Sequence, residues 1–239
     1  MKKLFFIVAA SIACTVSLHA QYYYDQSKNP DKNTGKISNI KSGRDFDRFY
    51  FLSWDNNEPL SNKDFISATS SLGTKLGFRK RINNEDKLWV GGDFGWSVYK
   101  QYVPTNTYLD GTQSITTDLY NYAYRYTLSV NLDYFFLPME KIVVPYAGLG
   151  IGAAYNKFSQ YYNIYGSSVG SWGFLVRPEV GVLIGFKENS SWRIKAAYHF
   201  DYSTNSADLV GNNFITPGVN NYENFMSTGF QVGLVKMAW

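Results

Sequence analysis

The chain has 239 residues, a formal net charge of +4 and an aromatic content of 18%. This length suits a single domain, and so small and dispersed a charge argues against a nucleic-acid-binding protein. No apolar run reaches the ~20 residues that a transmembrane helix needs. The many tyrosines, phenylalanines and tryptophans instead favour β-strands and boundaries between apolar and aqueous surroundings.

Residues 1–20 have the pattern of a secretory signal peptide, with two basic residues, an apolar segment and a small-residue cleavage region ending at Ala20. The alternative is lipoprotein processing, because residues 11–14 are lipobox-like and end at Cys14, the only cysteine. If a signal peptidase cleaves after Ala20, the mature chain has no cysteine, which excludes disulfides, thiol catalysis and cysteine-ligated zinc.

Residues 21–46 are polar and lysine-rich and lack strand periodicity. They are expected to form a flexible periplasmic arm. The arm is either a spacer or a docking segment for a periplasmic partner.

The rest of the chain shows the two-residue periodicity of β-strands. The clearest segment is 118–137, where even positions from Tyr120 to Phe136 are aromatic or aliphatic and odd positions from Asn121 to Asp133 are small or polar. Similar patterns predict eight strands, at about 47–56, 71–82, 87–102, 118–137, 142–155, 171–186, 191–203 and 222–239. Their connections alternate between long (57–70, 103–114, 156–170, 204–221) and short (83–86, 138–141, 187–190).

Three strands carry irregularities. The first alternates poorly, because residues 49–52 are aromatic or apolar on both faces. Pro178 in the sixth removes a backbone donor and predicts a local bulge. In the eighth, Lys236 falls on the apolar face, which predicts a bulge near Val235.

An even number of strands with alternating long and short connections predicts an all-β fold, an eight-stranded antiparallel up-and-down transmembrane β-barrel over residues 47–239. A soluble barrel would alternate in the same way, with its apolar face inward. The abundance of glycine and of charges of both signs on the polar face favours a narrow polar interior instead.

Three stretches resemble the small outer-membrane β-barrel proteins of two-membraned bacteria: residues 145–152 (PYAGLGIG), 173–181 (GFLVRPEVG) and 229–234 (GFQVGL). The aromatic end at Trp239 also resembles the terminal signal of such barrels. This resemblance implies export to the outer membrane, insertion by the barrel-assembly machinery, and contact with membrane lipids and lipopolysaccharide. It does not specify an activity, because such barrels include anchors, adhesion proteins and a few enzymes.

A set of charged residues is expected to face the barrel interior: Lys75, Arg79, Arg81, Asp93, Arg125, Asp133, Arg177, Glu179, Arg193, Lys195, His199 and Asp201. An eight-stranded barrel is just wide enough for side chains to fill it. Opposite charges can therefore pair to plug the interior, and the alternative is a narrow channel for ions or small solutes.

Motifs for catalysis and for cofactors are weak. His199, Asp201 and Ser203 share one strand face, as a lipid A-modifying hydrolase would need, but same-face neighbours stand roughly 6.5–7 Å apart and face the interior. Gly148, Gly150 and Ala153 match a dinucleotide pattern that requires a following helix, where a tyrosine- and serine-rich loop is expected. No zinc motif or P-loop is present, so no cofactor or metal is expected.

The expected role is non-enzymatic, structural or in surface interaction. The outer connections carry aromatic residues among small polar ones, as recognition surfaces do: Tyr102, Tyr108, Tyr161, Tyr162, Tyr165 and Phe214. Anchoring at the membrane interface, or extension of the strands, is the simpler explanation for them. A further alternative is an accessory barrel of a secretion apparatus, contacted through residues 21–46.

Overall fold

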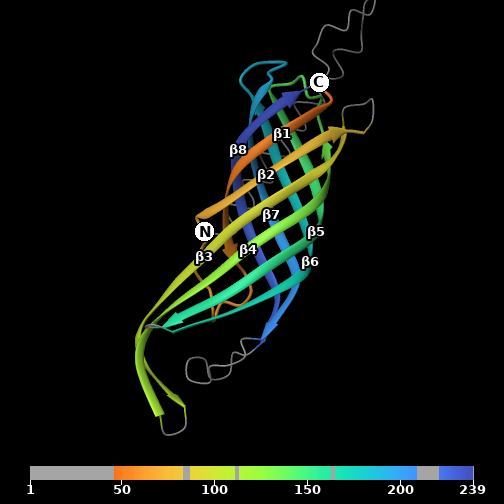
Figure 1. Cartoon of the computed structure of the whole chain (residues 1–239). Helices are drawn as coiled ribbons and strands as arrows, with labels where there is room; N and C mark the ends of the chain where they lie inside the picture. Colours follow the sequence, from red (N-terminus) through yellow and green to blue (C-terminus); the bar gives the residue numbers. More distant parts are fainter. Residues whose placement is uncertain (1–45, 83–86, 111–112, 163–164, 209–220, 239) are drawn as a thin grey trace, which may run out of the picture. The chain divides into compact units, whose positions relative to one another are not determined.

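The computed structural model describes residues 46–82, 87–110, 113–162, 165–208 and 221–238. In these residues the chain forms eight strands that close into one antiparallel barrel, each strand pairing with its neighbour in sequence and β8 with β1 (Figure 1). The strands are β1 (Arg48–Pro59), β2 (Leu72–Arg81), β3 (Leu88–Asp110), β4 (Gln113–Phe135), β5 (Val143–Tyr162), β6 (Tyr165–Gly185), β7 (Trp192–Asp208) and β8 (Asn221–Ala238). The predicted eight-stranded antiparallel up-and-down β-barrel is thus confirmed.

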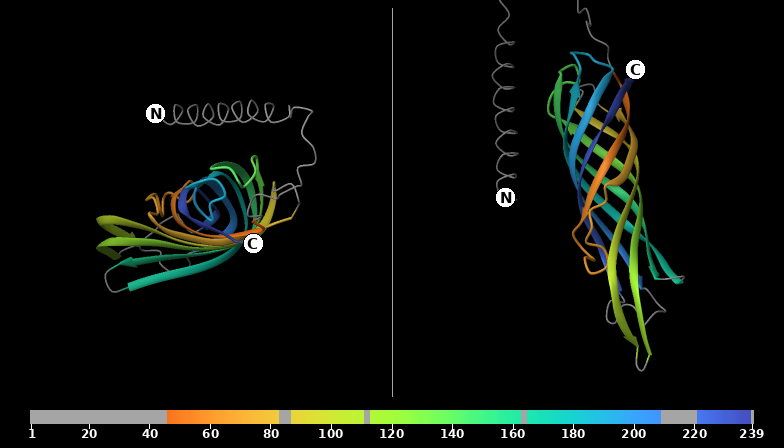
Figure 2. Two further views of the ribbon diagram at one scale, coloured as in Figure 1. Left: turned by 90° about the horizontal axis from the view of Figure 1, so that it is seen from above. Right: turned by 90° about the vertical axis from the view of Figure 1, so that its left-hand side faces the viewer.

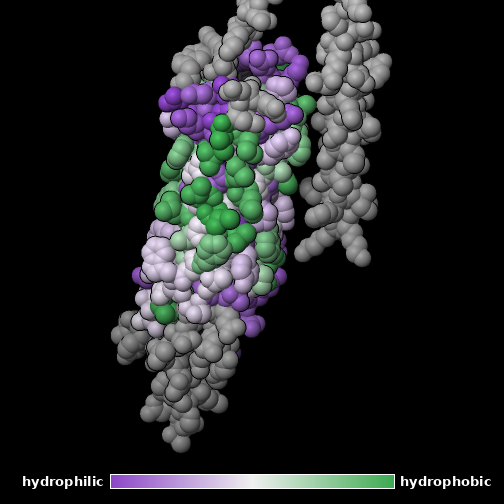
Figure 3. Space-filling model, turned by 90° about the vertical axis from the view of Figure 1, so that its right-hand side faces the viewer, coloured by the Kyte–Doolittle hydropathy of each residue, from purple (hydrophilic) through white to green (hydrophobic). Residues whose placement is uncertain are grey.

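The two faces of the wall differ as the periodicity predicts. On β4, Leu128 and Val130 point outward and are 64% and 65% exposed, whereas Arg125 and Asp133 point inward and are buried. On the face seen in Figure 3, apolar residues gather in a band across the barrel, with hydrophilic residues toward either end. No helix in the described residues has the length and apolar character to cross a membrane.

The two ends of the barrel differ in their connections. The short connections at 136–142 and 186–191 lie at the end where β1 begins and β8 finishes, which we call the turn end. The opposite end, the loop end, carries the hairpins between β3 and β4 and between β5 and β6. At both places the expected long loops, 103–114 and 156–170, are wrong, because the strands continue through them to Asp110, Gln113, Tyr162 and Tyr165.

Cross-strand pairs explain these longer hairpins. The rings of Tyr102 and Tyr120 lie 5.1 Å apart, and the hydroxyls of Thr107 and Thr116 are hydrogen-bonded at 2.8 Å. Such pairs stabilise a ladder without the apolar–polar contrast from which the strands were predicted. The resulting β3–β4 ribbon reaches farthest from the turn end (Figure 2). Strand β7 likewise extends to Asp208, and residues 209–220, with Phe214, lie outside the described residues.

The two predicted bulges are wrong. Pairing of β8 with β1 runs without a register shift from Ala238 to Ser227, so Val235 and Met237 simply point inward and Lys236 outward. The Lys236 ammonium lies 4.8 Å from the centre of the Trp192 ring, which accounts for a charge on the outer face. At Pro178 the register with β5 and β7 is also unchanged, and only the ladder to β7 is interrupted.

Buried apolar clusters occupy both ends of the interior. The turn-end cluster contains Phe49, Trp89, Phe135 and Met237, and Phe46, the last residue of the expected arm, packs with it. The loop-end cluster contains Tyr99, Phe158 and Phe225, together with Phe65 and Ile66. These last two belong to the connection between β1 and β2, which therefore sends two apolar side chains into the barrel mouth, while others such as Lys63 and Asp64 stay exposed.

Candidate functional site: the charged interior

A layer of ionised side chains fills the interior between the two apolar clusters. Five cations (Lys75, Arg79, Arg125, Arg177, Lys195) and five carboxylates (Asp55, Asp93, Asp133, Glu179, Asp201) are buried in the described part of this layer. The formal charges of these ten residues cancel. Burying a charge is costly unless it is paired and hydrogen-bonded, so the contacts of each carboxylate indicate what the layer can do.

Arg79 on β2 joins two carboxylates from different strands. Its guanidinium binds Asp93 on β3 through two nitrogens, and its Nε lies 2.5 Å from Oδ2 of Asp133 on β4. Such fork-shaped contacts fix geometry as well as charge. Arg79 therefore ties three neighbouring strands together from the inside.

Asp201 on β7 is the centre of a second group. Arg177 on β6 contacts both of its carboxylate oxygens at 2.5 Å, and Nη2 of Arg125 on β4 lies 3.4 Å from Oδ2. Arg125 also donates to the Ser227 hydroxyl of β8 at 2.9 Å. This group therefore spans the interior from β4 to β8.

Glu179 on β6 is the centre of the third group. Its carboxylate lies 2.8 Å from the Lys195 ammonium and 3.7 Å from that of Lys75. The Tyr146 hydroxyl donates to it at 2.5 Å, and the Gln231 amide donates to its other oxygen. No single strand could supply these partners, so the group depends on closure of the barrel.

Eleven of the twelve sequence-predicted interior residues are buried, in the part of the chain that the structure describes. Two residues of the set do not belong to the central layer. Arg81, at the turn end of β2, is only partly buried. Arg193 is buried but donates to the backbone carbonyls of Lys141, at 2.8 Å, and Met139, so it stabilises the connection between β4 and β5.

Sequence reasoning missed Asp55, which is 4% exposed. One of its carboxylate oxygens lies 3.7 Å from Nε2 of His199. The sequence does indicate its inward position, because Ser53, Asp55 and Asn57 alternate with residues of the other face. Phe49 and Phe51 lie on the same face, however, and made that face look apolar.

His199, Asp201 and Ser203 do not form a nucleophilic triad. The Ser203 hydroxyl donates to the backbone carbonyl of Phe225 at 3.2 Å, and His199 Nε2 lies 3.0 Å from Oδ1 of Asn57 and 4.0 Å from Asp201. A nucleophile needs its base within hydrogen-bond reach. All three side chains are also buried in the interior.

The remaining motifs are structural. Gly148 and Gly150 lie within β5, opposite Asp133 and Asn131, and the strand continues where a nucleotide-binding motif needs a helix. Among the described residues, no group of three or more acidic, histidine or cysteine side chains is placed to hold a metal ion.

No family model matches this sequence, and no curated protein matches it either. Solved structures of similar shape include Neisserial surface protein A (18% identity, 80% of this chain and 97% of that one, TM-score 0.49). Others are Ail, the attachment invasion locus protein of Yersinia pestis (11%, 80% and 97%, 0.44), and the N-terminal β-barrel domain of Pseudomonas aeruginosa OprF (12%, 80% and 98%, 0.39). The architecture assigned above rests on the strand pairing of this chain.

Proposed function

We propose that the chain is a non-enzymatic outer-membrane barrel protein whose interior is plugged by side chains and which acts as a structural or surface-interaction protein. The apolar outer band supports the location, because lipid-facing strands place apolar side chains outward and polar ones inward. Residues 1–20 would direct export, and residues 21–45, which precede the buried Phe46, would then form the arm on the periplasmic side.

The contacts of the interior carboxylates support the proposal that side chains plug the interior. Four of the five lie within 4.0 Å of an arginine or lysine, and Asp55 lies 3.7 Å from His199. Apolar clusters cover this layer toward both ends. A pathway for ions would need a continuous hydrated route, which paired charges between two apolar layers oppose.

Planar-bilayer conductance tests the plug. The folded wild-type barrel should insert without discrete conductance steps. A variant in which Phe65→Ser and Ile66→Ser weaken the loop-end cluster should also stay silent, because the central layer and the turn-end cluster remain. Steady ion-selective steps from the wild type would instead establish the narrow channel.

The β3–β4 ribbon supports the surface-interaction part of the proposal. Its outer part, where β3 and β4 pair only with each other, exposes Pro104, Asn106 and Thr107. Removing residues 104–117 and closing the gap with a two-residue turn should leave the barrel folded. Loss of binding to host cells or to other cell-surface molecules would support a recognition role. Unchanged binding would exclude the ribbon from recognition, so that only the structural role remained.

A further inference from the structure

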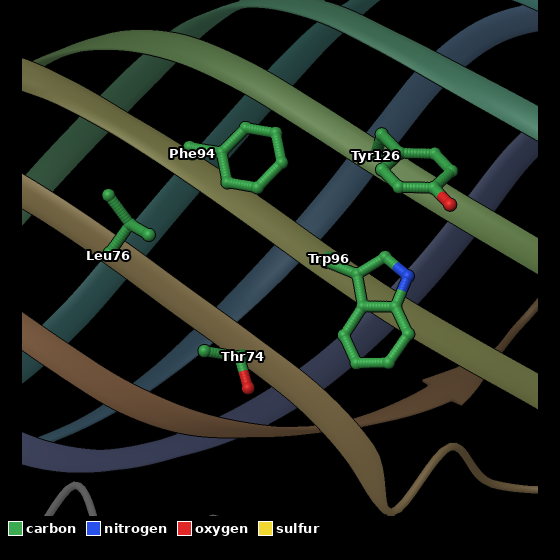
Figure 4. A pocket seen from close by; sticks show the side chains of 5 residues that line it. All are labelled: Thr74, Leu76, Phe94, Trp96 and Tyr126. Atoms are coloured by element: carbon green, nitrogen blue, oxygen red, sulfur yellow. The ribbon is translucent and has the colours of Figure 1, made fainter.

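A hollow of about 420 Å³ lies on the outer wall, not in the interior. It is lined by Thr74, Leu76, Phe94, Trp96 and Tyr126, from β2, β3 and β4 (Figure 4). Leu76, Phe94 and Tyr126 are 49%, 42% and 39% exposed. The hollow therefore interrupts the face that the proposed location turns toward lipid.

One small residue in a row of large ones accounts for the hollow. Outward side chains in direct register across six strands are Trp54, Thr74, Trp96, Tyr126, Tyr155 and Trp172. Thr74 is the only member of this row that is not aromatic. The Trp54 indole donates to the Ser71 carbonyl at 2.7 Å, and this ring does not line the hollow.

Two lysines stand on the same face toward the loop end. Lys100 lies four residues beyond Trp96 on β3, roughly 13 Å along the strand, and its ammonium is 5.7 Å and 5.8 Å from the ring centres of Tyr120 and Tyr122. Lys157 is exposed on β5, paired in register with Tyr124. Neither lysine has a carboxylate partner within the described residues.

We propose that this face of β2–β5 binds one phosphorylated glycolipid, with its phosphate groups at Lys100 and Lys157 and an acyl chain in the hollow beside Thr74. The dimensions agree, because Lys100 is level with Tyr122, eight residues from Val130 in the apolar outer band. Eight residues of a strand tilted by about 45° correspond to roughly 19 Å of depth, just beyond half of a ~30 Å hydrocarbon core. Basic residues at a membrane surface attract anionic headgroups, and the tyrosine rings hold the Lys100 ammonium at that level.

The inference rests on the proposed outer-membrane location, and the experiment first tests that separately. Folding of the purified chain into lipid vesicles is followed by circular dichroism and by protection from protease. Failure to fold there would reject the location itself. The lipid-binding measurement uses only protein that has folded in this first step.

Diphosphorylated lipid A is then added to the folded barrel in neutral detergent, and the lipid retained after gel filtration is measured by native mass spectrometry. The wild type should retain it at least fivefold better than fully dephosphorylated lipid A. Lys100→Gln with Lys157→Gln should remove most of this preference. Lys236→Gln is the matched control, because Lys236 also rests on an aromatic ring but at the turn end.

Thr74→Trp tests the acyl part without touching a charge. It completes the aromatic row, so retention of both lipids should fall severalfold while the barrel stays folded. Equal retention of the two lipids by the wild type, or unchanged retention by the lysine or Thr74 variants, would overturn the proposal. A dimer that Thr74→Trp dissociates would also overturn it, because a second copy would then occupy the hollow.

Discussion

Asp201 is the carboxylate of the central layer that two arginines contact, Arg177 and Arg125. Asp201→Ala should lower the free energy of unfolding by about 3–5 kcal/mol, because removing one partner leaves buried charge uncompensated. Urea unfolding in lipid vesicles measures this. The control is Asp47→Ala, because the Asp47–Arg48 pair is partly exposed to solvent and such pairs contribute much less than buried ones. Equal losses for both variants would contradict the assignment.

Trp89 provides the corresponding test of the turn-end cluster. Its side chain is 0% exposed, and its ring centre lies 5.3 Å from that of Phe49 and 5.9 Å from that of Phe135. Trp89→Ala should cost about 3–5 kcal/mol, as truncation of a large buried aromatic residue does. Trp172→Ala, at a 72% exposed position on the outer wall, should cost less in the same measurement. The prediction fails if the order of the two is reversed.

Individual interior residues could be predicted wherever a charged residue lies on the strand face opposite a clearly apolar one. Lys75, Asp93 and Glu179 are charged residues on strands whose opposite face is plainly apolar, and all three are buried as expected. This rule fails at Phe49 and Phe51, because these apolar residues point inward to the turn-end cluster. Asp55 was missed for the same reason. A barrel with a polar interior still has apolar clusters at both ends of that interior. Periodicity alone cannot distinguish these inward apolar residues from those of the outer wall.

At the scale of a strand, β4 approaches β5 so closely that an inward position of β5 has room only for glycine. A Cβ added at Gly152 would overlap the backbone carbonyl of Leu128 on β4, whereas one added at Gly92 on β3 would meet only ordinary contacts, starting at 3.4 Å. Gly152→Ala should therefore destabilise the barrel measurably and Gly92→Ala should not. Thermal unfolding of the two variants, compared side by side, checks this, and equal stability would contradict it.

Strand count and the order of long and short connections could be predicted, because alternation persists wherever one face of the wall is apolar. Strand ends beyond the apolar band could not. Past Tyr120 and Tyr161 both faces of a hairpin carry polar residues, so tyrosine, threonine and asparagine follow no period although the ladder continues. The inward course of the β1–β2 connection was also hidden. Only Phe65 and Ile66 distinguish it, and two apolar residues in a connection do not indicate a direction.

For the whole molecule, the decisive question is what surrounds the outer wall. Val130 on β4 is 65% exposed and lies between Leu128 and Leu132 in the apolar outer band. In a bilayer Val130→Arg should cost about 2–4 kcal/mol, because charge at the midplane is expensive there, and Leu72→Arg near the loop end should cost about 0–1 kcal/mol. Vesicle unfolding measures both. Were Val130→Arg neutral, the wall would face water and the proposed location would be rejected.

On the proposed outer-membrane location, the shape of the loop end decides what an antibody or a bacteriophage can bind. Asn121 on β4 donates to the Phe65 carbonyl at 3.0 Å, and Gln101 on β3 accepts from the Ser67 amide at 2.5 Å, so the β1–β2 connection is fastened to the barrel mouth. The ribbon of β3 and β4 stands beyond it (Figure 1). Changes selected by immune pressure should accordingly gather on that ribbon and spare Phe65 and Ile66, whose side chains are buried, and an epitope tag on the ribbon would be displayed farther out than one between β1 and β2.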